Sequence, residues 1–368
     1  MNELSKDKFR IIDANINRLG EGLRVLEEFA RMTLNDTVLT QKLKEMRHNT
    51  VKIDAVLYRN LLDSRDAAGD IGSSMDVEGE NNSRDTQGII VANAKRAQES
   101  FRVLEEMAKI QALNLNSETY RDARFGLYTL EKELVARILR KDKLERLKGL
   151  YVVIDTEWLK GRQPDAVARQ VIKGGAGVIQ LRCKEGSYRE FMNIAGDLRD
   201  ICRENGVIFI VNDSLEIALA VKPDGLHVGQ EDIPVVDLKQ LLPLDMILGC
   251  SVSALDEAKK ALKDGADYLG VGAMYATATK KTARVVGPAR IKQIKKAVDL
   301  PIVAIGGINR DNLKEVIAAG ADSAAVISAV MGAEDIEKAT RELVNIFRER
   351  EGGKSGRNGR SNKKRTNC

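Results

Sequence analysis

The chain has 368 residues, of which 43% are hydrophobic and 31% are charged, and its net charge is +5. This length allows two or more domains with separate cores, and no stretch approaches the roughly 18 apolar residues of a membrane span. The N-terminus lacks the pattern of a secretory signal, and the four cysteines have neither metal-binding nor disulfide-framework spacing. We therefore expect a soluble, cytoplasmic protein with no membrane partner.

The first 148 residues contain a near repetition. The segment NINRLGEGLRVLEEFA begins at Asn15 and NAKRAQESFRVLEEMA begins at Asn93, and a second similar pair lies around Arg47 and Arg124. In the first segment, apolar residues recur at the three- and four-residue spacing of a packed helix. The repetition predicts an all-α helical-bundle domain over residues 1–148, built from an internal duplication as two hairpins joined by a long polar loop.

Polar side chains also recur in the repeat. Surface ion pairs between Arg and Glu at helical spacing are one explanation. However, apolar positions differ between the copies, as in Leu19 and Ala97, whereas the polar residue types are retained. This comparison favours a polar site, whose candidate residues are Asn15, Arg18, Glu21, Arg24, Glu28, Asn93, Arg96, Glu99, Arg102 and Glu106.

Residues 149–349 have a different pattern. Short apolar runs alternate with helical patterns, and these runs are LYVVID, GVIQLR, VIFIVN, GLHVG, MILGCS, DYLGVG, PIVAIGG and SAAVIS. Continuous apolar strands that alternate with helices indicate parallel pairing. Eight such units predict an α/β fold, a (β/α)8 TIM barrel, whose active site lies at the C-terminal ends of the strands.

The last segment, residues 350–368, is rich in Gly, Ser, Asn, Lys and Arg. From Glu351 onward it holds six Lys and Arg residues against one Glu, so it accounts for the excess of positive charge. A segment without apolar anchors cannot offset the entropy of ordering, so we expect a disordered basic tail. It has no aromatic residues on which bases could stack, and we expect no nucleic-acid partner.

Two carboxylates follow neighbouring strands of the predicted barrel. Asp213 comes after the third apolar run and Asp232 after the fourth. Mg²⁺ prefers one or two carboxylates together with water and substrate phosphate oxygens. The pair predicts one Mg²⁺ in the barrel, although an aspartate at either position could instead cap a helix or a turn.

Cationic and glycine-rich segments end other strands. Gln180, Arg182 and Lys184 alternate after the second run, and Lys280 lies in a Thr- and Lys-rich loop after the sixth. Arg and Lys suit a pyrophosphate, whereas a solvated rim is the alternative. A second phosphate site is indicated by Gly306, Gly307 and the Ile327–Ser328 pair. Together these features predict transfer of a group from pyrophosphate to a phosphorylated acceptor.

The barrel residues resemble the thiamine phosphate synthase family. The resemblance rests on Gln180-x-Arg182-x-Lys184, Asn212-Asp213, His227-x-Gly229-Gln230-x-Asp232, Ser251, Thr277-x-Thr279-Lys280, Gly306-Gly307 and Ile327-Ser328. It implies condensation of hydroxymethylpyrimidine diphosphate with hydroxyethylthiazole phosphate, which gives thiamine phosphate and pyrophosphate. This sequence departs from the family pattern at Ala276, where a proline is usual.

The resemblance also implies roles for individual residues. It assigns Asp213 and Asp232 to Mg²⁺, and Gln180 and His227 to the pyrimidine. The residues assigned to the diphosphate are Arg182, Lys184, Asn212, Ser251 and Lys280, of which all but Asn212 are expected to be catalytic. The thiazole phosphate is assigned to Thr277, Ala278, Thr279, Gly307, Ile327 and Ser328.

The doubled helical motif resembles an alternative kinase module for hydroxymethylpyrimidine phosphate. The resemblance implies an ATP site. Because the sequence has no P-loop motif, the candidates for this site are the loop residues Arg65, Asp66, Asp70 and Arg84. A different reading is a non-catalytic dimerisation module, which implies a homodimer. For the barrel, the alternative is a phosphate-sugar isomerase or epimerase.

Overall fold

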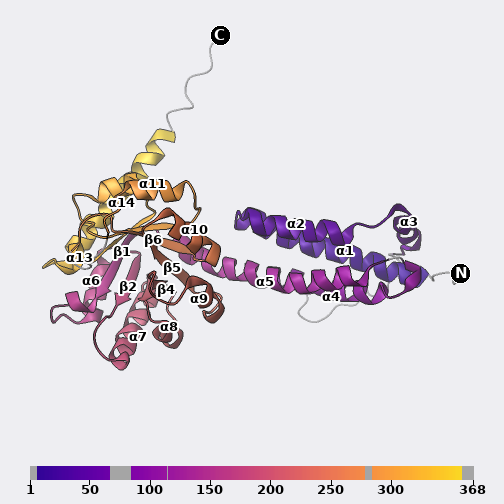
Figure 1. Cartoon of the computed structure of the whole chain (residues 1–368), viewed down its shortest axis with the longest axis horizontal. Coiled ribbons are helices and arrows are strands. Elements are labelled where there is room, and N and C mark those ends of the chain that lie inside the picture. The colour runs from indigo at the N-terminus through magenta and orange to yellow at the C-terminus, as the bar shows by residue number, and fades with distance from the viewer. Residues whose placement is uncertain (1–5, 67–83, 114, 278–283, 359–368) are drawn as a thin grey trace, which may run out of the picture. The chain divides into compact units, whose positions relative to one another are not determined.

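The computed structural model describes residues 6–66, 84–113, 115–277 and 284–358. The chain divides into two compact units, residues 1–141 and 142–368 (Figure 1). The predicted domain boundary lay at residue 148, seven residues later. The difference arises because Leu144 and Leu147 pack with residues of the barrel interior.

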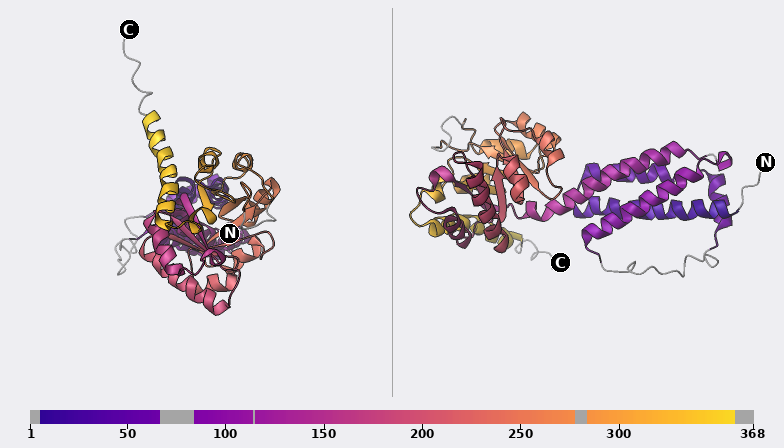
Figure 2. Two further views of the ribbon diagram at one scale, coloured as in Figure 1. Left: turned by 90° about the vertical axis from the view of Figure 1, so that its left-hand side faces the viewer. Right: turned by 90° about the horizontal axis from the view of Figure 1, so that it is seen from below.

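The helical unit consists of two hairpins. Its elements are α1 (Lys6–Glu28), a π-helical turn η1 (Phe29–Thr33), α2 (Thr37–Val51), α3 (Ala55–Ser64), α4 (Thr86–Met107), a 3-10 turn η3 (Gln111–Leu113) and α5 (Ser117–Glu145). The long helices α1, α2, α4 and α5 run alongside one another (Figure 2). The first copy of the repeat lies on α1 and the second on α4, and these two helices pack against each other.

The predicted apolar face of α1 forms the core of this unit. Ile12, Leu19, Leu23 and Leu26 are fully buried, and they pack with Phe101 and Leu104 of α4. At the crossing of the two helices a Cβ atom on Gly22 would lie only 3.0 Å from the backbone oxygen of Asn93. Glycine at this position therefore permits the close approach of α1 and α4.

The two hairpins differ in their second halves. In the first hairpin the helix ends at Val51, and a new helix, α3, begins after Asp54. The Asp54 side chain accepts hydrogen bonds from the backbone N–H groups of Val56 and Leu57, which caps α3. In the second hairpin α5 continues without a break to Glu145. Among the residues that the structure describes, the duplication is therefore asymmetric, because the first half has a helix, α3, that turns back onto α1, whereas α5 of the second half is unbroken.

The second unit is a closed parallel barrel, as predicted, with strand order β1 to β8. The strands are β1 (Gly149–Asp155), β2 (Val178–Arg182), β3 (Ile208–Asn212), β4 (Gly225–Val228), β5 (Ile247–Val252), β6 (Tyr268–Gly272), β7 (Ile302–Ile305) and β8 (Ser323–Val326). The helices and turn are η4 (Thr156–Trp158), α6 (Pro164–Lys173), α7 (Tyr188–Glu204), α8 (Leu215–Val221), α9 (Val235–Leu241), α10 (Leu255–Asp264), α11 (Ala289–Lys295), α12 (Leu313–Ala318), α13 (Ser328–Met331) and α14 (Ile336–Asn358).

Alternate residues of each strand point to opposite sides of the barrel wall. One set packs against the surrounding helices and forms the larger core. The other set fills the barrel interior, with Tyr151, Val178, Ile210 and Tyr268 among its buried members. The interior is therefore a packed core, and the polar residues that continue the inward positions, such as Gln180, lie toward the C-terminal ends of the strands.

Helix α14 corrects the prediction for the end of the chain. It extends to Asn358, so residues 350–358 are helical rather than disordered. Once a helix is formed, each added residue gains one hydrogen bond at low cost, and α14 continues from the folded residues before it. Residues 359–368 lie outside the described part of the chain. Within the described residues, no helix is long and apolar enough to cross a membrane.

Candidate active site

Polar side chains gather at the C-terminal ends of neighbouring strands. Gln180 and Arg182 end β2, Asn212 ends β3, His227 lies in β4 and Ser251 in β5. Strand register aligns Asn212 with His227, and a hydrogen bond joins Gln180 to Asn212. The structure therefore brings together, at one end of the barrel, the residues predicted from the ends of the second to fifth apolar runs.

Arg182 has a buried partner that the sequence analysis missed. Its Nη1 atom donates to Oδ2 of Asp155, the last residue of β1, at 2.5 Å. The Asp155 side chain is fully buried, and its Oδ1 atom accepts from the backbone N–H of Glu157. Asp155 therefore fixes the guanidinium group at the rim. The run LYVVID ended in this aspartate, so its position alone could have indicated the role.

The two predicted metal ligands lie near each other. Lys184 pairs with Asp213, whose backbone N–H donates to the carbonyl oxygen of His227, and Asp232 accepts from the backbone N–H of Gly229. Burial raises the pKa of Asp213, Lys184 opposes the rise, and the nearby Asp232 carboxylate adds to it. Two facing carboxylates are a donor set that Mg²⁺ accepts when substrate oxygens and water complete its shell.

A chain of hydrogen bonds crosses the barrel interior below this rim. Tyr151 donates to Gln180 at 2.5 Å, and Gln180 donates to Asn212 at 2.7 Å. The Tyr151 and Tyr268 hydroxyl groups are 3.2 Å apart, and Tyr268 bonds to Nδ1 of His227 at 3.0 Å. The other ring nitrogen of His227 bonds to the Ser251 hydroxyl at 2.9 Å. The chain connects four predicted site residues through two tyrosines that sequence reasoning had counted as apolar core.

His227 is held as a neutral ring. Burial lowers its pKa to about 4, although the charge of Asp232 acts in the opposite direction. Space for the ring comes from two strand glycines. A Cβ atom on Gly249 would lie 2.4 Å from Nδ1 of His227, and one on Gly270 would lie 2.8 Å from Cε1. The sequence of β5 and β6 therefore leaves room for a histidine that can donate through one nitrogen and accept through the other.

The predicted thiazole-phosphate residues lie on the other strands. Gly307 follows β7 with φ of 65°, and a Cβ atom there would lie 2.5 Å from the backbone oxygen of Ala276. Ile327 and Ser328 begin α13 directly after β8, and Thr277 is the last described residue of the loop after β6. Ala278, Thr279 and Lys280 lie outside the described residues.

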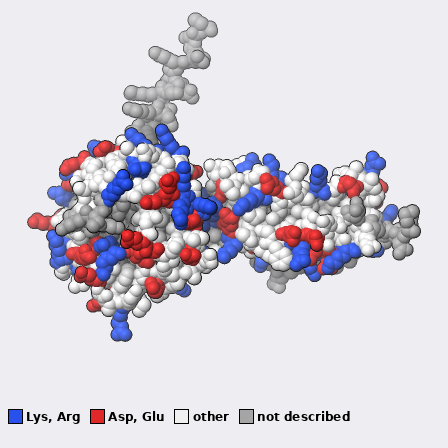
Figure 3. Space-filling view, viewed as in Figure 1, with Lys and Arg blue, Asp and Glu red and all other residues white. Residues whose placement is uncertain are grey.

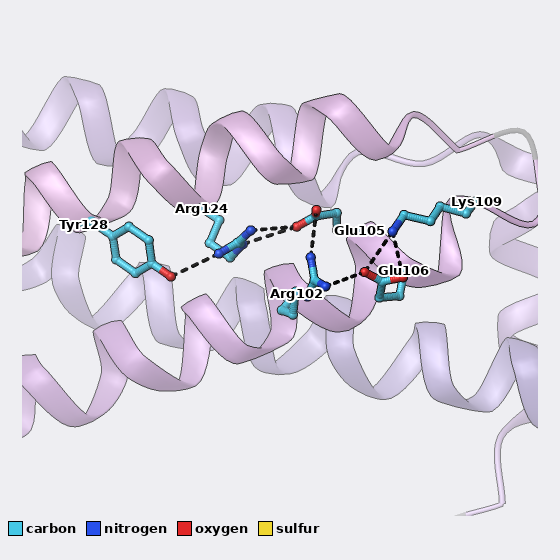
Figure 4. Close-up of polar contacts among 6 residues, drawn as sticks. All are labelled: Arg102, Glu105, Glu106, Lys109, Arg124 and Tyr128. Carbon is cyan, nitrogen blue, oxygen red and sulfur yellow. Dashed lines mark hydrogen bonds and ion pairs between the residues drawn. The ribbon is translucent and has the colours of Figure 1, made fainter.

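The helical unit contains one Glu–Arg cluster in each repeat, and each cluster is centred on a buried glutamate. On α4, Glu105 bonds to Arg102 on its own helix and to Arg124 on α5, both at less than 3.1 Å, and Arg124 also bonds to Tyr128 (Figure 4). The pKa of Glu105 is lowered, because the two arginines outweigh the opposing effect of burial. On α1, Glu27 bonds to Arg24 and, across the hairpin, to Arg47 at equivalent positions.

These clusters explain part of the repeated polar pattern. Arg24 and Arg102 each also pair with a second glutamate, Glu28 and Glu106. The Asn15 and Asn93 side chains donate to backbone carbonyl groups of their own helices. The ten predicted residues thus lie on two equivalent helices, α1 and α4. Glu27 and Glu105, which link the two helices of each hairpin, were not predicted, although both belong to the repeated sequence LEE.

The remaining candidates of the helical unit are on its surface or beside α3. Arg18, Glu21, Arg96 and Glu99 are exposed. Arg65 pairs with Asp13, and Asp66 follows it. Asp70 lies outside the described residues. On the face drawn in Figure 3, acidic and basic side chains are interspersed on both units.

The comparisons with known proteins divide the chain in the same way. The family model described as "Thiamine monophosphate synthase" matches residues 150–330, and the model described as "ThiD2 family" matches residues 10–133. A thiamine-phosphate synthase of Thermosynechococcus vestitus is 35% identical and aligns over 91% of this chain and 93% of its own length. One of Nostoc sp. is also 35% identical and aligns over 92% and 93%.

A solved structure aligns with about half of this chain. It is titled thiamine phosphate pyrophosphorylase from Pyrococcus furiosus, and it is 45% identical with a TM-score of 0.52. The alignment covers 55% of this chain and 96% of that chain.

Proposed function

Because this chain belongs to the thiamine-phosphate synthase family, we propose that its barrel joins hydroxymethylpyrimidine diphosphate to hydroxyethylthiazole phosphate. The products are thiamine phosphate and pyrophosphate, and the enzyme is a transferase of thiamine biosynthesis. The observation that carries the proposal is the meeting of Arg182, Lys184, Asp213 and Asp232 at the C-terminal end of the barrel. Family membership decides against the sugar-phosphate isomerase reading.

The positive side chains act on the leaving group. As the bond between the pyrimidine methylene carbon and the diphosphate oxygen breaks, negative charge grows on the diphosphate. Arg182, fixed by Asp155, and Lys184 stabilise that charge, and the Ser251 hydroxyl donates a further hydrogen bond. Lys280, outside the described residues, has the same proposed role.

The carboxylates Asp213 and Asp232 would hold Mg²⁺. A bound Mg²⁺ supplies a positive charge that neutralises diphosphate oxygens. The pKa of Asp213 is raised first by burial and also by the nearby Asp232 carboxylate. Both effects disfavour its negative charge, and a cation held between the two carboxylates would stabilise that charge, which supports this role.

The hydrogen-bonded chain orients the pyrimidine. Gln180, held by Tyr151 and Asn212, and the neutral His227 contact the ring and its amino group. The amino group stabilises the methylene cation that forms when pyrophosphate leaves, and the thiazole nitrogen then forms the new carbon–nitrogen bond. Such a dissociative reaction needs positioning and charge stabilisation rather than a protein nucleophile.

Substitution at Asp213 tests this assignment. Asp213→Ala is expected to abolish Mg²⁺-dependent release of pyrophosphate when both substrates are present. Asp256→Ala, on the first turn of α10, is the matched control, since it removes an aspartate that is outside the proposed site. Near-normal turnover by the Asp213 variant would contradict the metal assignment.

We propose further that the helical unit phosphorylates hydroxymethylpyrimidine phosphate with ATP. A phosphate oxygen of the substrate forms a bond to the γ-phosphorus, the bond to the β-phosphate oxygen breaks, and ADP leaves. The match of residues 10–133 to the ThiD2 family supports this proposal, because its product is the diphosphate that the barrel uses. The rival is a non-catalytic module that forms a homodimer in the cytoplasm.

The two readings are distinguished with the full chain in which Asp213→Ala has blocked the barrel. ATP and hydroxymethylpyrimidine phosphate are expected to give ADP and the pyrimidine diphosphate, detected by mass spectrometry. A folded dimer that forms no diphosphate would favour the assembly module. The blocked barrel ensures that the diphosphate accumulates and can be measured.

A further inference from the structure

A pocket of about 370 Å³ opens in the helical unit between α1, the end of α2 and α3. Its apolar lining comes from Ile16, Val51, Ile53 and Leu61, and Tyr58 of α3 adds an aromatic ring. Its polar lining is Asp13, Asn17, Glu21 and Arg65. An apolar lining with a few polar groups, at this volume, is typical of sites for small organic ligands.

One polar pair at this pocket is already ordered. Arg65 donates from Nε and Nη2 to the two carboxylate oxygens of Asp13, at 2.6 and 2.9 Å. Asp13 is 9% exposed, whereas the Arg65 side chain is 47% exposed. The buried carboxylate therefore fixes the exposed guanidinium group and leaves other N–H donors, which suit the oxygens of a phosphate.

A second polar group lies at the other end of the α1 lining. Glu21 is exposed and stands eight residues after Asp13, which corresponds to about 12 Å along a helix. A carboxylate accepts hydrogen bonds from an amino group. The pocket thus offers a phosphate-binding group and an amine-binding group, separated by apolar and aromatic side chains.

The second repeat retains a glutamate at the position of Glu21, as Glu99, but it does not reproduce the other features of the pocket. At the positions equivalent to Asp13 and Gly20 it has Val91 and Gln98, and the Gln98 side chain donates to Glu131 of α5 at 2.6 Å. The wall formed by α3 also has no counterpart there, because α5 continues as one helix. Since Asp13, Gly20 and the α3 wall occur in the first copy and not in the second, the pocket is not a by-product of packing two copies of one hairpin.

We infer that this pocket binds the phosphate acceptor of the helical unit, an aminopyrimidine whose hydroxymethyl group carries a phosphate ester. This inference rests on the proposed kinase function. The ring lies on the apolar lining against Tyr58, the exocyclic amino group donates to Glu21, and the phosphate accepts from Arg65. The bidentate pair with Asp13 holds Arg65 in position before the ligand arrives.

The sharpest test fills the pocket with the residue of the other repeat. Gly20→Gln introduces the side chain found at position 98, and the first added atom is tolerated, since a Cβ atom there would lie 3.6 Å from its nearest neighbour, Val51. The control is Gln98→Ala, which changes the equivalent position of the second repeat. Circular dichroism checks that both variants retain their helices.

The probe is hydroxymethylpyrimidine phosphate, titrated calorimetrically into the full chain with Asp213→Ala in the barrel. Gly20→Gln is expected to weaken binding at least tenfold and to raise KM for this substrate by a similar factor, whereas Gln98→Ala changes neither by more than about twofold. Arg65→Lys should weaken binding of hydroxymethylpyrimidine phosphate but have much less effect on binding of unphosphorylated hydroxymethylpyrimidine. The reason is that lysine lacks the planar, forked N–H donors of the guanidinium group.

The outcomes separate this inference from the kinase proposal. If the chain forms the diphosphate and folded Gly20→Gln does so with an unchanged KM, the pocket assignment is wrong and the kinase function stands. If the phosphate binds and Gly20→Gln abolishes binding, but no diphosphate forms with ATP, the pocket stands and the kinase function is wrong. If the full chain that carries only Asp213→Ala binds no hydroxymethylpyrimidine phosphate, the pocket assignment is overturned.

Discussion

At the scale of single residues, the proposed chemistry depends on side chains that do not touch the substrate. Asp155 is the clearest case, because its fully buried carboxylate bonds to Arg182 and to the backbone of Glu157. A hydrogen bond between charged groups contributes about 1.5–3 kcal/mol. The position of the guanidinium group is therefore set by a residue one strand away.

Replacing Asp155 tests this positioning role. Asp155→Asn keeps the size of the side chain but removes its charge, and we expect kcat/KM for thiamine phosphate formation to fall by about 10- to 100-fold. Steady-state release of pyrophosphate measures the change. Glu157→Gln is the control, because Glu157 is exposed and its Oε2 atom lies 3.9 Å from Nη1 of Arg182. This substitution should alter kcat/KM less than about threefold. Equal effects of the two substitutions would refute the special role of Asp155.

The buried His227 predicts a pH dependence of stability. Its pKa is lowered to about 4 in the folded barrel, from about 6.5 in the unfolded chain. The unfolded state therefore binds more protons between these values, and stability falls as the pH falls through this window. Between pH 7.5 and pH 5 the loss from this group is about 2 kcal/mol.

Urea unfolding measures this effect through the fluorescence of Trp158, the single tryptophan of the chain. The variant His227→Asn lacks the titrating ring, so it should lose about 2 kcal/mol less than the unsubstituted chain between the two pH values. Identical pH dependence in both proteins would show that His227 is not the group responsible.

The residues at the ends of the apolar runs could be found from the sequence because parallel strands present their C-terminal ends together. Arg182, Asn212 and Ser251 were found in this way. Tyr151 and Tyr268 were not, because an aromatic residue within a buried strand fits either side of the barrel wall, and only the register decides which side it faces. Their hydroxyl groups then have to find partners in the interior, and they bond to each other, to Gln180 and to His227.

At the scale of secondary-structure elements, the helical repeat was readable because its apolar spacing is regular over the whole of α1. The break between α2 and α3 was not predicted, since the residues after Val51 continue an apolar pattern. Asp54 decides the local structure by capping a new helix, an effect of hydrogen bonding to particular backbone groups rather than of periodicity. The same break creates the α3 wall of the pocket.

The crossing of α1 and α4 gives a prediction about packing. Gly22→Leu would place a side chain against the backbone oxygen of Asn93, which a Cβ atom alone would approach to 3.0 Å. We expect a loss of about 2 kcal/mol in the stability of the helical unit, measured by circular dichroism during urea unfolding. Gly20→Ala, two residues earlier on the same helix, meets only an ordinary contact and should stabilise the unit by about 0.5–1 kcal/mol. Destabilisation of similar size by both substitutions would contradict the close-contact explanation.

At the scale of the whole molecule, the two units were predictable because each has its own apolar pattern. The structure divides the chain after residue 141, seven residues before the predicted boundary. The sequence from Asp142 to Lys148 reads as the end of a helix, and nothing in its composition assigns it to either unit. The contacts of these residues assign them to the barrel unit. Leu147 is 1% exposed within the barrel interior, Lys143 pairs with Asp224 and Asp245, and Arg146 donates to the carbonyl group of Gly206.

This assignment predicts different behaviour for two barrel fragments. A fragment of residues 142–358 keeps Leu147 and Lys143, and we expect it to fold and to form thiamine phosphate within about twofold of the rate of the full chain. The solved structure from Pyrococcus furiosus supports this, since 96% of that chain aligns with only 55% of this one.

A fragment of residues 149–358 exposes the interior that Leu147 covers. Loss of this buried leucine alone costs about 2–3 kcal/mol, so its Tm should be about 4–12 °C lower than that of the longer fragment. Thermal unfolding followed by Trp158 fluorescence compares the two fragments, and Leu147→Ala within residues 142–358 isolates the contribution of the side chain. Equal Tm values for all three would show that residues 142–148 only link the units, in which case the boundary belongs near residue 148.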